Sequence, residues 1–379
     1  MTSRQAWAAM AAGVLLWGGA SVGHLRAVQA AVPAVHAAAA GGSAGPAAAP
    51  VPGRLSETGL YRDLATLEVD PRNRPFTPQY PLWTDGAAKR RWVRLPEGAV
   101  IDVSAIDNWD YPVGTRFWKE FAFDGRRVET RMLVKTSAAG WAFASYVWNE
   151  DQRDAVLAPE AGVADVAEVA PGKYHSVPSI ADCRSCHDSR RTEVMGFTAL
   201  QLSDDRDPLA PHAEAVAPGM VTLKTLAAEG RLSPPRPDLV ATPPRVAASD
   251  PRERAVLGYL STNCGSCHNR ASTIASLGLV LKYSLAAPGG CAADAIATTA
   301  GRPGHWVVPT APEGASRLLS PGRPDLSALV YRARSRRPAS QMPPLGSVVA
   351  DREALALMDA WIASGVPASA ACLAPVSTH

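Results

Sequence analysis

Two copies of the motif Cys-x-x-Cys-His constrain this chain more than any other feature of its sequence. In each copy two thiols lie one helical turn apart and a histidine follows directly, a spacing suited to bonding one edge of a haem and binding its iron. We therefore expect two covalent c-type haems. Their attachment residues would be Cys183 and Cys186, then Cys264 and Cys267, with His187 and His268 as proximal iron ligands.

A zinc site or a redox dithiol fits the cysteine pairs less well than haem. Four thiolates from two pairs would suit one tetrahedral zinc ion, but this leaves the histidine after each pair without a role. A redox dithiol is expected beside a βαβ unit, whereas these pairs lie in sequence typical of helices and loops. Haem attachment accounts for both features.

The N-terminus carries an apolar stretch over residues 6–22, preceded by a short polar segment that contains Arg4. This pattern predicts a secretory signal peptide over residues 1–30. An uncleaved membrane anchor is the alternative, because the stretch is near the lower length limit for crossing a bilayer. Either way we expect a protein that is periplasmic or otherwise exported, and that contacts a membrane only where this segment is left uncleaved. Export agrees with the motifs, since bacterial c-type haems are attached outside the cytoplasm.

The overall composition limits the choice of partner and framework. The 38 Lys and Arg residues nearly balance the 35 Asp and Glu residues, so nucleic acid is not an expected partner. Six cysteines in 379 residues are too few for a disulfide scaffold. The two outside the motifs, Cys291 and Cys372, either form one disulfide in an oxidising compartment or are separate thiols.

The sequence changes in character along the chain. Residues 31–54 are rich in Ala, Gly and Pro and predict a flexible linker. We expect a β-rich domain over 55–171, a first haem segment over 172–247 and a second haem domain over 248–379. The predicted fold class is α+β, with an N-terminal antiparallel β domain followed by a mostly α-helical haem-binding region.

Short alternating runs over 90–95, 115–123, 127–135 and 141–148 predict antiparallel strands. Asp124-Gly125, between two of these runs, predicts a hairpin. In the third run mostly charged side chains alternate with Val, Thr and Met, so we expect one face of the sheet to lie in water. The six tryptophans of the region are expected to pack in the core, with a docking surface for a partner or glycan as the alternative.

The second motif has a helical pattern on either side. Residues 249–263 have helical spacing, with Ser249 as candidate N-cap, and another helix is expected from Asp351 to Gly365. Met342 lies in a Met-Pro-Pro loop before that last helix. We expect its thioether to be the sixth iron ligand, because methionine is common in this role and the prolines stiffen the loop. Core filling, the usual role of a lone methionine, is expected instead for Met358.

This order of helix, haem motif, methionine loop and helix resembles that of a class I cytochrome c domain. Segments 259–269, 341–346 and 355–361 carry the resemblance. It implies that the haem-binding region ends in a cytochrome c-like domain whose first and last helices cross. Their buried seam would contain Leu257, Leu260, Leu357 and Trp361.

The sixth ligand of the first haem stays open from the sequence alone. His175 and His212 are the favoured candidates and would give a bis-histidine haem of lower reduction potential. Met195 and Met220 rank below them; Met195 is so close to His187 that the chain has a short path to the far face of a haem. A five-coordinate iron is a further alternative and would leave a position for a small ligand.

The chain from about residue 55 also resembles a bacterial family of dihaem cytochromes in which a Trp-rich β region precedes two haem motifs. Segments 55–61, 80–85, 129–134 and 146–149 carry this resemblance. It implies the architecture and the number of haems, and it names neither a substrate nor the sixth ligand of the first haem.

An electron relay between donor and acceptor proteins is the function that two haems in one chain favour, rather than an enzyme. One alternative is a dihaem peroxidase-like enzyme, which needs an open axial position with acid and base groups above it. The short separation of the two motifs leaves little room for its paired haem domains. Another alternative is a binding module whose β domain recognises a periplasmic dehydrogenase.

Overall fold

The computed structural model describes residues 51–187, 194–286 and 293–366, which belong to one compact unit. The predicted signal segment, Cys291 and Cys372 lie outside the described residues. Within the described part, no helix has the length and apolar character needed to cross a membrane.

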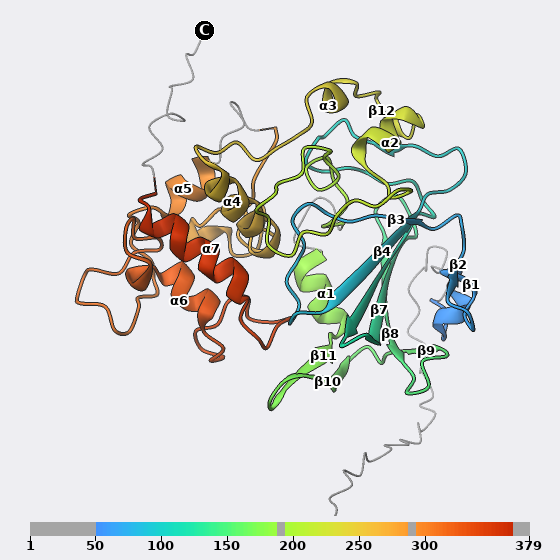
Figure 1. The fold of residues 1–379 in the computed structure, drawn as a ribbon, viewed down its shortest axis with the longest axis horizontal. Coiled ribbons are helices and arrows are strands. Elements are labelled where there is room, and N and C mark those ends of the chain that lie inside the picture. The colour runs from blue at the N-terminus through green and yellow to red at the C-terminus, as the bar shows by residue number, and fades with distance from the viewer. Residues whose placement is uncertain (1–50, 188–193, 287–292, 367–379) are drawn as a thin grey trace, which may run out of the picture. The chain divides into compact units, whose positions relative to one another are not determined.

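The described residues form twelve strands and seven α-helices, most of which are labelled in Figure 1. The strands are β1 Tyr61–Asp63, β2 Glu68–Val69, β3 Arg74–Pro75, β4 Ala88–Arg94, β5 Ile101–Asp102, β6 Arg116–Phe123, β7 Arg126–Lys135, β8 Trp141–Trp148, β9 Ala155–Leu157, β10 Val163–Ala170, β11 Lys173–Val177 and β12 Leu232–Ser233. The helices are α1 Ile180–His187, α2 Leu223–Ala228, α3 Asp238–Ala241, α4 Pro251–Asn263, α5 Ala293–Thr299, α6 Ala328–Arg334 and α7 Arg352–Ala363.

The largest sheet has six antiparallel strands in the order β3-β4-β6-β7-β8-β9. Four of them, β4, β6, β7 and β8, coincide with the runs predicted from sequence alternation, so those predictions are confirmed. The hairpin at Asp124-Gly125 is also confirmed. Both residues adopt positive φ, 48° and 77°, as a tight two-residue turn between twisted strands requires.

Both faces of this sheet are covered, so the prediction of one face in water is wrong. On one face Trp92, Trp118 and Trp148 pack with Leu55 and Leu60. The other face has an apolar end, where Val93 and Phe117 pack with Phe197, and a charged end that includes Glu129 and Arg91. The exposed fractions of Glu129 and Arg91 are only 0% and 6%, because other segments of the chain lie over them. Trp109 is buried too, which leaves Trp83 and Trp141 half-buried, and this agrees with the predicted core role of the tryptophans.

The helices α4 and α7 pack against each other, and α6 packs on α7, as Figure 1 shows with α4 in dark yellow, α6 in orange and α7 in red. Leu257, Leu260 and Trp361 are buried in one apolar cluster, and Leu357 is partly buried against it. The seam predicted for these four residues is therefore confirmed. Asp250, rather than Ser249, caps α4, because its carboxylate accepts hydrogen bonds from the Arg252 and Glu253 amides.

The predicted mostly α-helical haem-binding region is wrong. The structure is mostly β-sheet, with several antiparallel sheets and 21% helix. Among the described residues only α4 and α7 are longer than eight residues. The predicted cytochrome c-like domain at the C-terminal end of this region is part of that wrong prediction. Of its expected features, the packing of α4 on α7 is observed.

Proline accounts for the short helices after residue 172. Alanine and leucine in this part of the chain favour helix, but prolines interrupt it at short intervals, for example at 234, 235, 237, 243 and 244. Each proline lacks an amide hydrogen and its ring clashes with the preceding turn of a helix. The chain between α2 and α4 therefore runs mostly as irregular loop.

Gly258, in the middle of α4, touches the ring of Tyr80 so closely that a Cβ there would lie 2.1 Å from it. Gly258→Ala should lower the free energy of unfolding by about 1–3 kcal/mol through overpacking, although the same change in an exposed helix is stabilising. Thermal unfolding followed by circular dichroism measures the effect. Gly53→Ala, where a Cβ would meet nothing within 4 Å, is the control and should leave the melting temperature unchanged.

Candidate functional site

The first Cys-x-x-Cys-His motif lies within α1. Ser179 and Asp182 begin this helix with reciprocal hydrogen bonds: the Asp182 amide donates to Ser179 Oγ over 3.0 Å, and the Ser179 amide donates to Asp182 Oδ2 over 3.0 Å. Cys183 and Cys186 are half-buried and lie one helical turn apart. The helix therefore holds both thiols on one side, as attachment to a single haem edge requires.

The helix α1 packs on the six-stranded sheet at β8. The ring of His187 lies 5.3 Å from the ring of Phe143 on β8. Burial raises the pKa of the Cys183 thiol, while the nearby Arg131 guanidinium on β7 opposes that rise. The first motif thus lies over the face of the sheet that carries the buried charges.

His175, a predicted iron ligand, lies on β11 between two carboxylates. Its Nε2 is 3.2 Å from Glu129 Oε2, its Nδ1 is 3.7 Å from Asp85 Oδ2, and its exposed fraction is 3%. Burial lowers the pKa of His175, but the hydrogen bonds with Asp85 and Glu129 raise it above its ordinary value on balance. In this arrangement both ring nitrogens face carboxylates, so binding iron would require His175 to exchange at least one of them.

His212, the other predicted histidine ligand, lies at the N-terminus of α7. Its Nε2 is 2.8 Å from Asp351 Oδ1, and its Nδ1 is 3.3 Å from Glu353 Oε2. The ring also packs against Trp83, with 4.8 Å between ring centroids. The hydrogen bond with Asp351 raises the pKa of His212, and burial opposes this. These contacts tie His212 to the helix that follows the Met342 loop.

The second motif begins where α4 ends. Gly265 is required between the two cysteines, because a Cβ there would lie 2.4 Å from the Ser261 carbonyl oxygen and 2.8 Å from the Lys282 Cα. Burial raises the pKa of the Cys264 thiol to about 12. The close turn holds Cys264, Cys267 and His268 against the end of the helix.

The imidazole of His268 has the properties that iron binding needs. Its Nδ1 is buried and has no hydrogen-bond partner within the described part of the chain. Burial, helped by the positive charge of Arg332, lowers the pKa of His268, which favours the neutral ring. Neutral imidazole is the form that ligates a metal. The His268 side chain therefore suits the iron-ligand role predicted for it.

The Met342 loop is held by two arginines. The Met342 amide donates to the Arg332 carbonyl over 2.9 Å, and Arg336 Nη2 donates to the Met342 carbonyl over 3.0 Å. Since Arg332 also acts electrostatically on His268, it links the methionine loop to the predicted proximal ligand. Met342 itself is half-buried.

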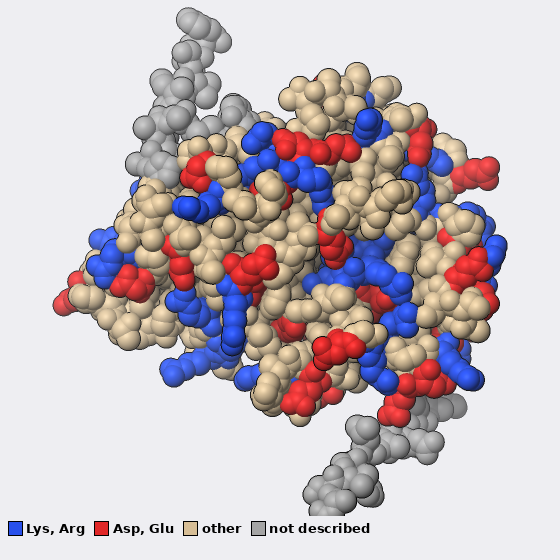
Figure 2. Space-filling model, viewed as in Figure 1, with Lys and Arg blue, Asp and Glu red and all other residues tan. Residues whose placement is uncertain are grey.

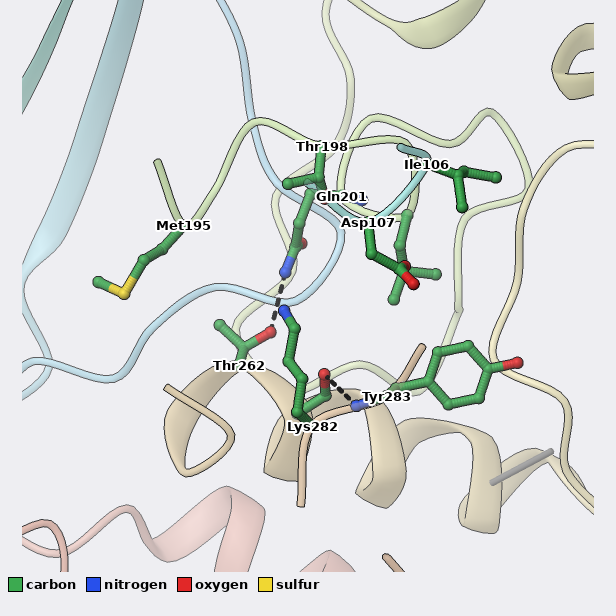
Figure 3. A pocket seen from close by; sticks show the side chains of 10 residues that line it. Ile106, Asp107, Met195, Thr198, Gln201, Thr262, Lys282 and Tyr283 are labelled. Atoms are coloured by element: carbon green, nitrogen blue, oxygen red, sulfur yellow. Dashed lines mark hydrogen bonds between the residues drawn. The ribbon is translucent and has the colours of Figure 1, made fainter. Parts of the chain in front are cut away.

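The two methionines ranked lower for the first haem have different surroundings. Met220 Sδ accepts a hydrogen bond from the Ala217 amide over 3.4 Å in an exposed turn. Met195 lines a pocket, and in Figure 3 its side chain points away from Gln201 and Thr262. Nothing in these contacts links either sulfur to α1.

The pocket drawn in Figure 3 lies between the segment after the first motif and the end of α4. Across it Gln201 Nε2 donates to Thr262 Oγ1 over 2.8 Å, and nearby the Tyr283 amide donates to Ser261 Oγ over 3.0 Å. The first of these bonds connects the two motif-bearing segments, and the second ties the end of α4 to the chain beyond the second motif. The lining residues are Ile106, Asp107, Met195, Thr198, Leu200, Gln201, Ser261, Thr262, Lys282 and Tyr283.

Asp85 joins the surroundings of both motifs. Its Oδ1 accepts hydrogen bonds from the Val348 and Val349 amides over 2.7 and 2.8 Å, just beyond the Met342 loop. Its second carboxylate oxygen faces His175. Neighbouring Trp83 adds two bonds, because its amide donates to Asn263 Oδ1 and its indole Nε1 donates to the Val349 carbonyl. One short segment before β4 therefore holds α4, the loop before α7 and β11 together.

Sequence reasoning missed Asp85, Glu129 and the cations beside them as parts of the site. Glu129 pairs with Arg131 through two hydrogen bonds of 2.7 and 2.9 Å. Burial raises the pKa of Glu129, but Arg131 and His175 outweigh it and lower the pKa to about 2. The only sequence signal was alternation of charged with uncharged residues, which by itself does not distinguish a solvated face from a covered one.

Comparison of the chain with known protein families, curated proteins and solved structures found no match. Within the described residues, no three His, Cys, Asp or Glu side chains form a group suited to a metal ion. The described thiols of the two motifs are therefore not gathered into one four-cysteine group. Function is therefore inferred from the residues of the two motifs and from their surroundings.

Asp85→Ala should destabilise the protein by about 2–4 kcal/mol, because it leaves the Val348 and Val349 amides without their acceptor. Asp85→Asn keeps an acceptor oxygen and should cost less than half as much. Urea unfolding followed by tryptophan fluorescence compares the two variants. Equal losses would contradict the assigned role of the two amide hydrogen bonds.

Proposed function

We propose that this chain is an exported electron carrier with two covalently bound c-type haems. One haem would be attached at Cys183 and Cys186, and the other at Cys264 and Cys267. The observation that carries the proposal is the repeated Cys-x-x-Cys-His sequence, each copy set in or directly after a helix with its histidine half-buried. Its partners would be a donor and an acceptor protein.

Each residue of the motif has a separate task in this proposal. The cysteine sulfurs hold the group covalently, so that it is not lost outside the cytoplasm, and His187 and His268 would bind the iron through neutral imidazole. When bound, haem supplies a one-electron iron couple. The protein contributes burial and charge around the group, which set its reduction potential.

The second site has the more complete set of candidate ligands. Met342 would be the second protein ligand of this iron together with His268, and its loop is fixed by Arg332 and Arg336. Histidine–methionine ligation raises the reduction potential of a haem. For the first site His175 and His212 stay predictions, and each would have to exchange a carboxylate partner to reach an iron.

The proposal predicts two haems per chain, with one lost for each altered cysteine pair. The protein is made in a host that exports it and matures c-type cytochromes, and bound haem is counted by the pyridine haemochrome assay and by mass under denaturing conditions. Cys183→Ala with Cys186→Ala, and Cys264→Ala with Cys267→Ala, should each retain one haem.

Ser185→Ala and Ser266→Ala change the same two motifs without removing a thiol, and should retain both haems. A wild-type chain that carries no covalent haem, or that holds zinc at its cysteines, would refute the proposal. Reduced protein whose spectrum shifts with carbon monoxide and which turns over hydrogen peroxide would favour a peroxidase over a carrier.

Met342→Leu should abolish the sulfur-to-iron absorption band at the red end of the oxidised spectrum and lower one of the two reduction potentials. Met358→Leu is the matched control, since Met358 is buried in the core beside Trp361 and should leave the band in place. Spectroelectrochemical titration measures both quantities. An unchanged band in Met342→Leu would remove Met342 from the site.

A further inference from the structure

Four cations share one face of the six-stranded sheet. Arg91 on β4 lies directly across from Lys119 on β6, and Lys119 lies directly across from Arg131 on β7. Lys89, two residues before Arg91, points to the same face. Like charges that face each other across strands destabilise a sheet. This row of cations therefore requires compensating negative charge.

The described part of the chain supplies only some of that compensation. Glu129 pairs with Arg131, and Glu214 Oε2 lies 3.0 Å from Arg91 Nη1. No carboxylate among the described residues comes within 4.0 Å of the Lys89 or Lys119 ammonium group. Lys119 instead lies over the Phe121 ring, 4.8 Å from its centroid. Carboxylates act on the lysines only at longer range, Glu214 and Asp351 on Lys89 and Glu129 on Lys119. The positive charges of these two lysines therefore have no ion-pair partner in the described part of the chain.

Arg91 gives the clearest sign that a partner belongs at this position. Its exposed fraction is 6%, yet its Nη2 has no hydrogen-bond partner within the described part of the chain. A buried guanidinium donor without an acceptor destabilises the folded chain. A planar guanidinium also matches the geometry of a carboxylate, which accepts two parallel hydrogen bonds from it.

Burial and the neighbouring cations also disfavour the charged forms of Lys89 and Lys119. Burial, followed by the neighbouring Arg91, lowers the pKa of Lys89 to about 8. Burial lowers the pKa of Lys119 as well, and Arg91 and Lys89 add to the effect. A negatively charged ligand beside these groups would raise the pKa of both lysines back toward the ordinary range.

This charged surface lies where the first motif packs. Arg131 is within electrostatic reach of the Cys183 and Cys186 sulfurs, and His187 contacts Phe143 on the neighbouring strand. Figure 2 shows Lys and Arg side chains gathered over the region of this sheet, with acidic side chains among and around them. The surface is therefore positioned to meet a group attached at α1.

We propose that Arg91, Lys119 and Lys89 bind the two carboxylates of the haem attached at Cys183 and Cys186. This inference rests on the proposed function. Haem carries two propionate groups, which match in number and sign the two lysine charges without an ion-pair partner in the described part of the chain. Arg91 would offer its unpartnered Nη2 to one carboxylate, and the lysines would act as point charges. Arg131 remains paired with Glu129 and orders the edge of the site.

The test is the reduction potential of the first haem in the full-length protein with both haems attached. Its wave is identified as the one that Met342→Leu does not move. A nearby cation favours the reduced iron, so Lys119→Gln should lower this potential, with a threefold to tenfold change in the reduction equilibrium constant. The second wave should not move.

Lys224→Gln removes the same charge from the exposed start of α2 and is the matched control, which should leave both waves in place. Lys119→Arg keeps the charge and should retain the wild-type potential, which separates loss of charge from loss of structure. If Lys119→Gln does not fold, Lys89→Gln and Arg91→Lys give the same comparison.

Two outcomes would overturn this inference and leave the proposed function standing. One is that the protein carries two haems and the reduction potential of the first haem is the same in Lys119→Gln and Lys89→Gln as in the wild type. The second is calorimetric binding of succinate or phosphate to the wild-type holoprotein that Lys119→Gln abolishes, which would assign the cations to a diffusible anion. Absence of haem at Cys183 and Cys186 would instead contradict the proposed function itself.

Discussion

The carboxylate of Asp85 connects the parts of this protein that carry the two motifs. One oxygen accepts the Val348 and Val349 amides, and the second faces His175 on β11. A buried carboxylate is stable only where its charge and its hydrogen-bonding capacity are both met. The loop before α7, the strand before α1 and the start of the large sheet must therefore keep fixed positions around it.

Buried charges elsewhere on the six-stranded sheet also need partners of opposite charge. Glu129 is fully buried and stays ionised because Arg131 and His175 contact it, and Arg131 in turn lies beside Lys119. Charges buried in this way interact strongly, since little water screens them. A redox group placed next to such a surface would have its potential set by the balance of these charges, which is why the sheet belongs to the proposed first site.

The two proposed sites differ in how much of each is built by its own helices. At the second, α4 leads into the cysteines, the Met342 loop is fixed by Arg332 and Arg336, and α7 packs on α4. At the first, α1 is short and packs on β8, so the sheet forms much of its surroundings. The reduction potentials of the two sites should therefore respond to different substitutions.

Local sequence was sufficient for the strands β4, β6, β7 and β8, for the Asp124-Gly125 hairpin and for the helices around the second motif, because each depends on short-range periodicity and turn chemistry. It also determined the cysteine and histidine spacing on which the proposed function rests. The helix content after residue 172 was overestimated, since prolines outweighed the helical preference of their neighbours. Only the tertiary structure decided that Glu129, Arg131, Lys119 and Arg91 lie on a covered face, because whether a polar face is solvated depends on what packs over it.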